Sequence, residues 1–291
     1  MSTSTTSKIS AYFSLFLGVM LLGFAAIFVR LAAAPGTVTA FYRMLVASMV
    51  ITVPLIMRMR SRSFQLAQSG IKFALLSGLF VSLNLAFWTT GVMIGGATNP
   101  TLMLTTAPIW VGLGSMLFFQ ESHNRRFWFG VLSTMLGAII VLGFDLSFAY
   151  ESGLGTFFGI LAAVFIAVYM MTIQKGRKYL EALPFFWITT ISSMLILLLY
   201  NLISHQQLSG YSTFSIINFV ALGILVQIGA WFSIIYAQGI LPASIVSPTL
   251  LGQPVVTAIV AVPLLGEPIS PFQVIGAFIV ISGVIIVHRS R

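Results

Sequence analysis

The chain has 291 residues, of which 58% are hydrophobic and only 7% are charged, and its mean hydropathy is +1.06. So few charged side chains cannot cover the surface of a water-soluble protein of this length, which excludes a soluble globular class and indicates a protein embedded in lipid. The net charge of +9 comes without a basic and aromatic patch outside the membrane flanks, which argues against nucleic acid as a partner, and the absence of cysteine excludes disulfide and thiolate chemistry.

Apolar stretches follow one another along the chain, and each is long enough to cross a hydrocarbon core as a helix. Ten spans are predicted, at residues 9–29, 36–57, 70–93, 98–119, 127–144, 154–174, 184–203, 214–236, 242–265 and 270–288. A β-barrel would need short alternating segments, whereas these runs are continuously apolar. The predicted fold is therefore an all-α integral membrane protein with ten transmembrane helices.

The first stretch has a second interpretation, because Lys8, an apolar run and the small residues at 32–34 resemble a secretory signal peptide with its cleavage site. The run from Ile9 to Val29 is longer than a typical signal-peptide core, and Arg30 interrupts it before the small residues. We therefore expect this stretch to be a retained membrane span.

The positive charges lie between alternate spans, and this distribution predicts the orientation of the chain. With a cytoplasmic N-terminus, all 14 lysines and arginines except Arg30 and Arg43 fall on the cytoplasmic side, whereas Asp145, Glu151 and Glu267 fall outside. The positive-inside rule therefore predicts that both the N- and C-termini are cytoplasmic, in a multi-pass protein of the cell inner (plasma) membrane.

A pattern at the end of the first half recurs without a gap at the end of the second half. The matching pairs are Pro108 and Pro254, Glu121 and Glu267, Gly130 and Gly276, and Gly137 and Gly283. Five spans per half is an odd number, so the second half must cross the membrane in the opposite sense from the first. We predict two inverted five-helix repeats, residues 1–146 and 147–291.

The proline, the glutamate and the two glycines of each half, on ten spans, resemble the EamA-type branch of the drug/metabolite transporter superfamily. The resemblance covers essentially the whole chain. It implies a central cavity lined mainly by spans 1, 3, 4, 6, 8 and 9, peripheral spans 5 and 10, and export or uptake of small organic metabolites. It does not name the substrate, because members handle amino acids, their derivatives, drugs and other solutes.

Pro108 and Pro254 lie within predicted helices, where each lacks an amide hydrogen and leaves a carbonyl one turn earlier without its usual donor. We predict a break or kink at both, which is either a hinge beside the transport pathway or a packing kink. The four repeated glycines are predicted to be close helix contacts rather than ligand positions.

Charged residues within or beside the spans are expected to be structural. Glu121 and Glu267 stand at predicted helix ends, and with no carboxylate near mid-membrane we expect facilitated diffusion or exchange rather than proton coupling through a side chain. Arg43, inside the second span, is expected to bond to carbonyls or headgroups, with substrate contact as the alternative. Solvated or interfacial side chains are expected for the histidines near span ends, which are His123, His205 and His288.

The best candidates for substrate contact are two pairs of an amide and an indole, each spaced i, i+4 on one helix face. Asn84 and Trp88 lie in the third span, and Gln227 and Trp231 lie in the eighth. Because these spans are counterparts in the repeat, the pairs are expected to converge on one cavity, although an amide in lipid needs a hydrogen-bond partner with or without a ligand. Further polar candidates at similar depth are Thr105, Thr106, Tyr169 and Gln253.

An apolar, aromatic cavity with a few neutral hydrogen-bonding groups suits amino acids with large or aromatic side chains and related amphiphilic compounds. We expect transport of such metabolites by alternating access, as an exporter or a facilitator or exchanger; drug or organic-cation efflux is the alternative, and a channel or an integral membrane enzyme is less favoured. The sequence has no paired-aspartate or metalloprotease motif, so no enzyme activity, cofactor or metal is expected. The expected partners are a small-molecule substrate and the lipid bilayer, and a monomer suffices for the ten-span pathway.

Overall fold

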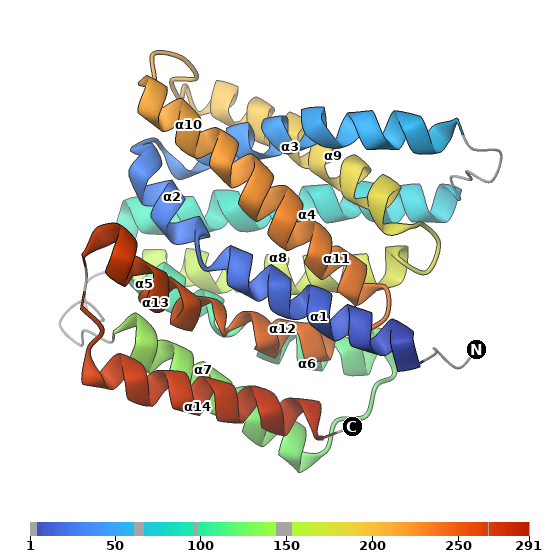
Figure 1. Ribbon diagram of the computed structural model, residues 1–291, viewed down its shortest axis with the longest axis vertical. Coiled ribbons are helices and arrows are strands. Elements are labelled where there is room, and N and C mark those ends of the chain that lie inside the picture. The colour runs from blue at the N-terminus through green and yellow to red at the C-terminus, as the bar shows by residue number, and fades with distance from the viewer. Residues whose placement is uncertain (1–4, 61–66, 96–97, 144–152, 267, 291) are drawn as a thin grey trace. The chain divides into compact units, whose positions relative to one another are not determined.

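The computed structural model describes residues 5–60, 67–95, 98–143, 153–266 and 268–290, and Glu267 therefore lies outside the described residues. Within these ranges the chain forms helices joined by turns, without a strand (Figure 1). The helices are α1 (Thr5–Leu22), α2 (Ala25–Ala32), α3 (Gly36–Met59), α4 (Gln68–Gly95), α5 (Thr98–Leu104), α6 (Ala107–Phe119), α7 (Arg125–Leu142), α8 (Gly153–Gly176), α9 (Ala182–Ile203), α10 (Thr213–Ala221), the π-helix η2 (Leu222–Phe232), α11 (Ser233–Gln238), α12 (Ala243–Leu250), α13 (Gln253–Leu265) and α14 (Pro271–His288).

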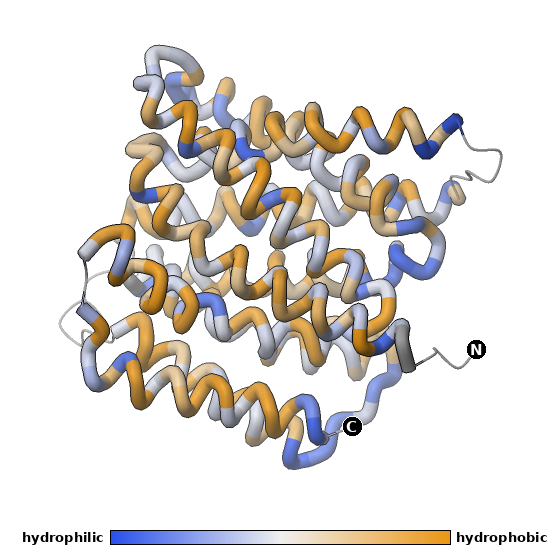
Figure 2. The backbone as a smooth tube through the Cα atoms, in the orientation of Figure 1, coloured by the Kyte–Doolittle hydropathy of each residue, from blue (hydrophilic) through white to orange (hydrophobic). Residues whose placement is uncertain are grey.

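Ten helical segments of the described chain are long and apolar enough to cross a membrane, and they overlap all ten predicted spans. Figure 2 shows that apolar residues run along these helices, while hydrophilic residues gather near their ends and in the turns. The predicted all-helical, ten-span fold is confirmed.

Several spans are irregular. The first divides between α1 and α2, the fourth between α5 and α6, and the ninth between α12 and α13, while the eighth passes through α10, η2 and α11. The divisions of the fourth and ninth spans agree with the prolines in the sequence. The division at Gly23 and Phe24 and the π-helix were not predicted, because neither position carries a helix-breaking proline.

The helices form two compact units, and each unit combines segments from both halves of the sequence. Unit 1 contains Met1–Ala86 and Thr172–Leu241, and unit 2 contains Phe87–Met171 and Pro242–Arg291. Helices α4 and α8 contribute to both units. The compact units therefore differ from the predicted repeats at residues 1–146 and 147–291, which describe sequence similarity rather than packing.

In unit 1, α3 packs against α9 and η2, and α1 packs against η2 and α11. Phe41, Met44 and Leu197 form part of the buried core between α3 and α9. Hydroxyl groups join α4 to α9, because Ser82 Oγ lies 2.9 Å from Ser193 Oγ. Small polar residues of this kind let membrane helices approach closely where the hydrophobic effect between them is absent.

In unit 2, α7 and α14 lie side by side and pack through the repeated glycines (Figure 1). A Cβ atom built on Gly137 would lie 2.7 Å from the carbonyl oxygen of Gly276, and one built on Gly130 would lie 2.9 Å from that of Gly283. The contact runs backward along α14 as it advances along α7, so the two helices are antiparallel. Only glycine permits so close an approach of two backbones.

Helices α6 and α13 have the same length and the same features at both ends. Each has 13 residues with proline as its second residue, which suits proline because an amide there has no partner within the helix. Each also ends at a residue in the left-handed conformation, Gln120 with φ 55° and Gly266 with φ 69°. The repeat therefore extends to the backbone geometry at both ends of these helices.

Candidate functional site

Each repeated proline lies at the start of the second helix of a broken membrane span. Pro108 is the second residue of α6, which follows α5 after a short break, and Pro254 is the second residue of α13, which follows α12 in the same way. A proline in mid-span removes one backbone hydrogen bond and its ring excludes the regular helix before it. The predicted breaks are confirmed, whereas a hinge motion at them stays a prediction.

The backbone at each break changes to the tighter i to i−3 pattern of hydrogen bonds. In the fourth span the Thr105 amide donates to the Leu102 carbonyl at 3.0 Å, and in the ninth the Leu251 amide donates to the Pro248 carbonyl at 3.1 Å. Such 3₁₀ turns inside a helix commonly mark strain or a functional hinge. Both breaks lie within segments long enough to cross the membrane, where an irregular backbone needs protein or water around it.

Two indole N–H groups are anchored on threonines of the broken fourth span. Trp88 Nε1 donates to Thr101 Oγ1 and Trp110 Nε1 donates to Thr106 Oγ1, both at 3.2 Å. The hydroxyl hydrogens of the candidates Thr105 and Thr106 are used locally, because they donate to carbonyls three residues earlier at 2.7 and 2.6 Å. Sequence reasoning missed Trp110, because a single tryptophan in an apolar run carries no spacing signal.

The remaining candidates of unit 2 lie on α8 and α13. Tyr169 is fully buried in α8, and Gln253 is the partly buried first residue of α13. Beside Trp88, the ring of Phe87 stacks on Phe165 with centroids 5.3 Å apart. Trp88 therefore lies next to an aromatic stack, and its own indole hydrogen is already used.

The candidates of unit 1 are Asn84, Gln227 and Trp231. Asn84 and Gln227 are 6% and 2% exposed, and Trp231 is partly exposed one turn beyond Gln227. The Oε1 atom of Gln227 is buried and has no hydrogen-bond partner among the described residues. A buried acceptor without a donor is rare and costly, so Gln227 is the candidate that most needs an external partner.

Gln227 and Trp231 both lie in the π-helix η2, where close helix contacts accompany the widened turn. A Cβ on Gly223 would lie 2.6 Å from Val46, and one on Gly229 would lie 2.8 Å from Leu21. π-Helical segments are rare and frequently occur at functional sites. No sequence signal predicts this π-helix, because a Gly-containing apolar run is equally compatible with an α-helix.

The unit boundary falls within α4, between the two members of the first amide and indole pair. Asn84 belongs to unit 1 with Gln227 and Trp231, while Trp88 belongs to unit 2 with the threonines, Tyr169 and Gln253. The expected convergence of the two pairs stays a prediction.

Arg43 lies on α3 of unit 1 and is partly buried. Its carbonyl oxygen approaches η2, where it would lie 3.3 Å from a Cβ on Gly223. The preceding Tyr42 stacks on Phe219 with ring centroids 4.7 Å apart, and its hydroxyl donates to the Leu208 carbonyl. Arg43 therefore stands where α3 is held closely against the eighth span and the turn before it.

Glu121 and His123 form a polar cluster in unit 2 that differs from the expectation for His123. The imidazole of His123 is 1% exposed, so it is not solvated, and the Glu121 side chain is 15% exposed. Burial arises from aromatic neighbours, because the His123 ring stacks on Phe127 with centroids 4.0 Å apart. Sequence reasoning failed here because the position at a span end does not show what packs over it.

Arg177, in the turn after α8, is a partly buried cation that binds backbone carbonyls in unit 1. Its Nε atom donates to the Ile235 carbonyl at 3.2 Å, and its Nη1 atom donates to the Leu180 carbonyl. Burial lowers the pKa of Arg177 from its ordinary value to about 10, and nearby Glu181 and Tyr236 partly oppose this shift. The guanidinium therefore stays charged at neutral pH and ties the turn after α8 to α11.

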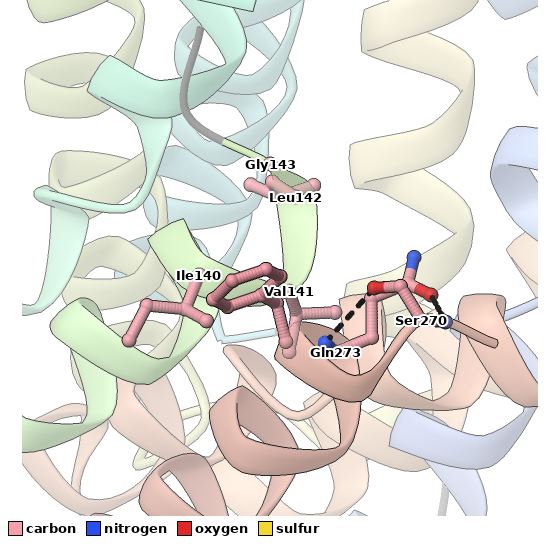
Figure 3. Close-up of a pocket in the computed structure, with 7 residues that line it drawn as sticks. Ile140, Val141, Leu142, Gly143, Ser270 and Gln273 are labelled. Carbon is pink, nitrogen blue, oxygen red and sulfur yellow. Dashed lines mark hydrogen bonds between the residues drawn. The ribbon is translucent and has the colours of Figure 1, made fainter.

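A groove of about 430 Å³ opens in unit 2 beside the end of α7 and the start of α14 (Figure 3). Its wall includes Val141, Gly143, Ser270 and Gln273. The two polar side chains cap α14. The backbone N–H of Gln273 donates to Ser270 Oγ at 3.2 Å, and the backbone N–H of Ser270 donates to Gln273 Oε1 at 2.9 Å. The groove offers mainly apolar surface, with its polar groups used by the helix cap.

Ten apolar spans, two of them broken at equivalent prolines, define a multi-pass membrane protein with the architecture of a transporter. No group of three or more His, Asp or Glu side chains within the described ranges is placed to hold a metal ion. The EamA-like transporter family matches residues 9–143 and 153–289. The chain therefore belongs to the EamA-like transporter family and is a multi-pass membrane transporter.

One relative agrees with this assignment, and one solved structure agrees with the fold. The chain is 24% identical over 206 residues to the "Uncharacterized transporter YdfC" of Bacillus subtilis (strain 168), a match that covers 69% of this chain and 67% of that protein. A solved structure described only as "Crystal structure of protein" has a TM-score of 0.79 at 16% identity, covering 96% of this chain and 97% of the other. At this identity the second comparison shows the fold alone.

Proposed function

We propose that this transporter moves small organic metabolites, in particular amino acids with large or aromatic side chains, across the plasma membrane by alternating access, as an exporter or a facilitator or exchanger. The observation that carries the proposal is the pair of membrane spans broken at Pro108 and Pro254. Broken helices at membrane depth are typical of transporter substrate pathways, because the freed backbone groups need water, substrate or protein.

The chemistry of the candidates supports a neutral or amphiphilic substrate. In unit 1 the side-chain amide of Gln227 is almost fully buried. In unit 2 the indole N–H of Trp88 is already bonded to a threonine. An indole with its N–H engaged presents only its apolar π face, which favours aromatic rings and cationic groups. The unpartnered oxygen of Gln227 favours a donor such as the ammonium group of an amino acid.

The antiparallel contact between α7 and α14 supports inverted repeats. These helices carry the repeated glycines, so they are counterparts in the two halves, and counterparts of inverted repeats must point in opposite directions across the membrane. We further propose that the repeats comprise residues 1–146 and 147–291, that both termini are cytoplasmic as the positive-inside rule requires, and that one chain forms a complete pathway.

The test is counterflow of radiolabelled tryptophan and phenylalanine into proteoliposomes loaded with the unlabelled amino acid. We expect acceleration by internal substrate, which a channel does not show. Trp88→Ala and Trp231→Ala are expected to lower uptake while the protein remains folded and inserted, whereas Trp187→Ala, which removes an indole bonded to Thr52 at 2.8 Å, is the structural control.

Unchanged uptake kinetics in both Trp88→Ala and Trp231→Ala would remove these residues from the substrate site. Counterflow of tetraphenylphosphonium without counterflow of either amino acid would replace the proposal by organic-cation efflux. A metabolite export screen in cells with and without the protein would then identify the substrate.

A further inference from the structure

The cluster around Glu121 connects two spans of unit 2 through titratable groups. Ser244, the second residue of α12, donates its hydroxyl hydrogen to Glu121 Oε2 at 2.6 Å. On the other side of the carboxylate, His123 Nε2 lies 3.8 Å from Glu121 Oε2 and 2.7 Å from Ser115 Oγ on α6. The end of α6 is therefore tied to the beginning of α12 by one carboxylate.

The hydrogen bonds of Ser115 determine which nitrogen of His123 carries a hydrogen. Ser115 donates its single hydroxyl hydrogen to the Gly112 carbonyl at 2.9 Å. The hydroxyl oxygen must then accept from His123, so Nε2 carries a hydrogen in this arrangement. The same nitrogen lies 3.8 Å from Glu121 Oε2, too far for a hydrogen bond, so the histidine acts on the carboxylate through its charge when it is protonated.

Three interactions therefore depend on the negative charge of Glu121. The short bond from Ser244 is charge-assisted, the contact with His123 is an ion pair when the imidazole is protonated, and the carboxylate lies at the positive end of the α12 dipole. Proton binding to the carboxylate weakens all three together. The 15% exposure of the Glu121 side chain lets protons from water reach it while the imidazole stays buried.

No other acidic group of the described part of unit 2 competes at this end. On α7, Arg125 and Arg126 have exposed side chains, and Arg289 after α14 is also exposed. His288 on α14 is bonded through Nε2 to Thr249 Oγ1 at 2.9 Å rather than to Glu121. Helices α6 and α12 carry no charged residue.

We propose that Glu121, with His123 and Ser244, is a proton-binding site that controls the contact between α6 and α12. The ionised carboxylate acts as a latch that holds α6, the second helix of the broken fourth span, against α12, the first helix of the broken ninth span. Uptake of one proton from water opens this latch. The proposal rests on the proposed transport function for its biological meaning, since α6 and α12 belong to the two broken spans. It revises the expectation that Glu121 is only a helix-end residue.

The test uses the absence of cysteine from the chain, which allows a single reporter thiol without other changes. Ala243, adjacent to Ser244, is 0% exposed and is replaced in Ala243→Cys. The protein in lipid nanodiscs is labelled with a membrane-impermeant maleimide, and the rate is divided by that of the exposed reporter Arg126→Cys to cancel the pH dependence of the thiol. We expect the ratio to rise about tenfold from about pH 8 to about pH 3, because a carboxylate stabilised in its ionised form takes up a proton only below the ordinary Glu pKa. Protonation of the imidazole alone strengthens its ion pair with Glu121 and should leave labelling slow.

Glu121→Gln, which resembles the protonated carboxyl group, is combined with Ala243→Cys and is expected to give fast labelling of the reporter thiol at both pH values. Glu181→Gln is the matched control, because this exposed carboxylate is paired with Arg58 at 3.1 Å in unit 1 and should leave the pH response unchanged. If Glu121→Gln does not fold, Ser244→Ala tests the same bond and should accelerate labelling at about pH 8, where the carboxylate is ionised.

Slow labelling at all pH values, or a pH response in Glu121→Gln equal to that of the parent, would overturn the proposal. These measurements use no transported substrate. Loss of amino-acid counterflow would therefore overturn the proposed function while leaving the labelling result to decide on the latch.

Discussion

Gly137 and Gly276 form a close backbone contact between α7 and α14, and adding one methyl group there tests the packing of unit 2. A Cβ on Gly137 would lie 2.6 Å from the Val280 amide nitrogen, and one on Gly276 would lie 2.8 Å from the Gly137 carbonyl oxygen. Ordinary contacts begin at 3.4 Å, and the obstacles are backbone atoms that cannot rotate away, so the helices must separate by about 0.8 Å.

Overpacking of this kind costs about 1–3 kcal/mol, while alanine gains about 1 kcal/mol of helix propensity over glycine. Gly137→Ala is therefore expected to destabilise unit 2 by up to about 2 kcal/mol, and adding Gly276→Ala should cost less than a second full increment because the helices are already apart. The assay is unfolding in mixed micelles followed by far-ultraviolet circular dichroism.

Gly153→Ala is the matched control for these variants, because a Cβ at Gly153 would meet nothing within 4 Å. It should leave the free energy of unfolding unchanged or slightly raised. If Gly137→Ala is as stable as Gly153→Ala, α7 and α14 do not approach at these glycines, and the structural support for inverted repeats is lost.

Two further predictions concern unit 1. Arg177→Leu leaves the Ile235 and Leu180 carbonyls without their donor and should lower the free energy of unfolding by about 2 kcal/mol. Arg126→Leu, at an exposed position, is the control and should not change it. Equal melting of the two variants would show that Arg177 is dispensable. A double-mutant cycle with Ser82→Ala and Ser193→Ala should give a coupling free energy of about 0.6 kcal/mol, as measured for hydrogen bonds between membrane helices, and zero coupling would contradict the contact between α4 and α9.

The membrane spans and the breaks of the fourth and ninth spans were predictable because they depend on local properties of the chain. A helix crosses lipid where about 20 successive residues are apolar, and a proline breaks it wherever its amide was needed. Both rules apply to α6 and α13, whose second residues are Pro108 and Pro254. The repeated glycines were also visible, since a duplicated chain keeps residues that two close helices require.

Burial and pairing at the candidate site were less accessible to sequence reasoning. Trp88 and Trp110 look alike in the sequence, yet only the fold shows that each indole is held by a threonine of the broken span. The π-helix around Gln227 has no local signature, because its widened turn is stabilised by what packs around it rather than by its own residues.

By itself, the sequence determined the class of protein, the number of spans, the orientation expected from charge and the positions of the two breaks, because hydropathy, charge and proline act over one helix at a time. Only the tertiary structure decided that His123 is buried and that Glu121 meets Ser244, because the first depends on how the turn after α6 packs against α6 and α7, and the second joins residues 123 positions apart in the chain. It also decided that each compact unit draws helices from both repeats. The physical reason is that side chains acquire their solvent, their charge partners and their hydrogen bonds from neighbouring helices, which no single segment specifies.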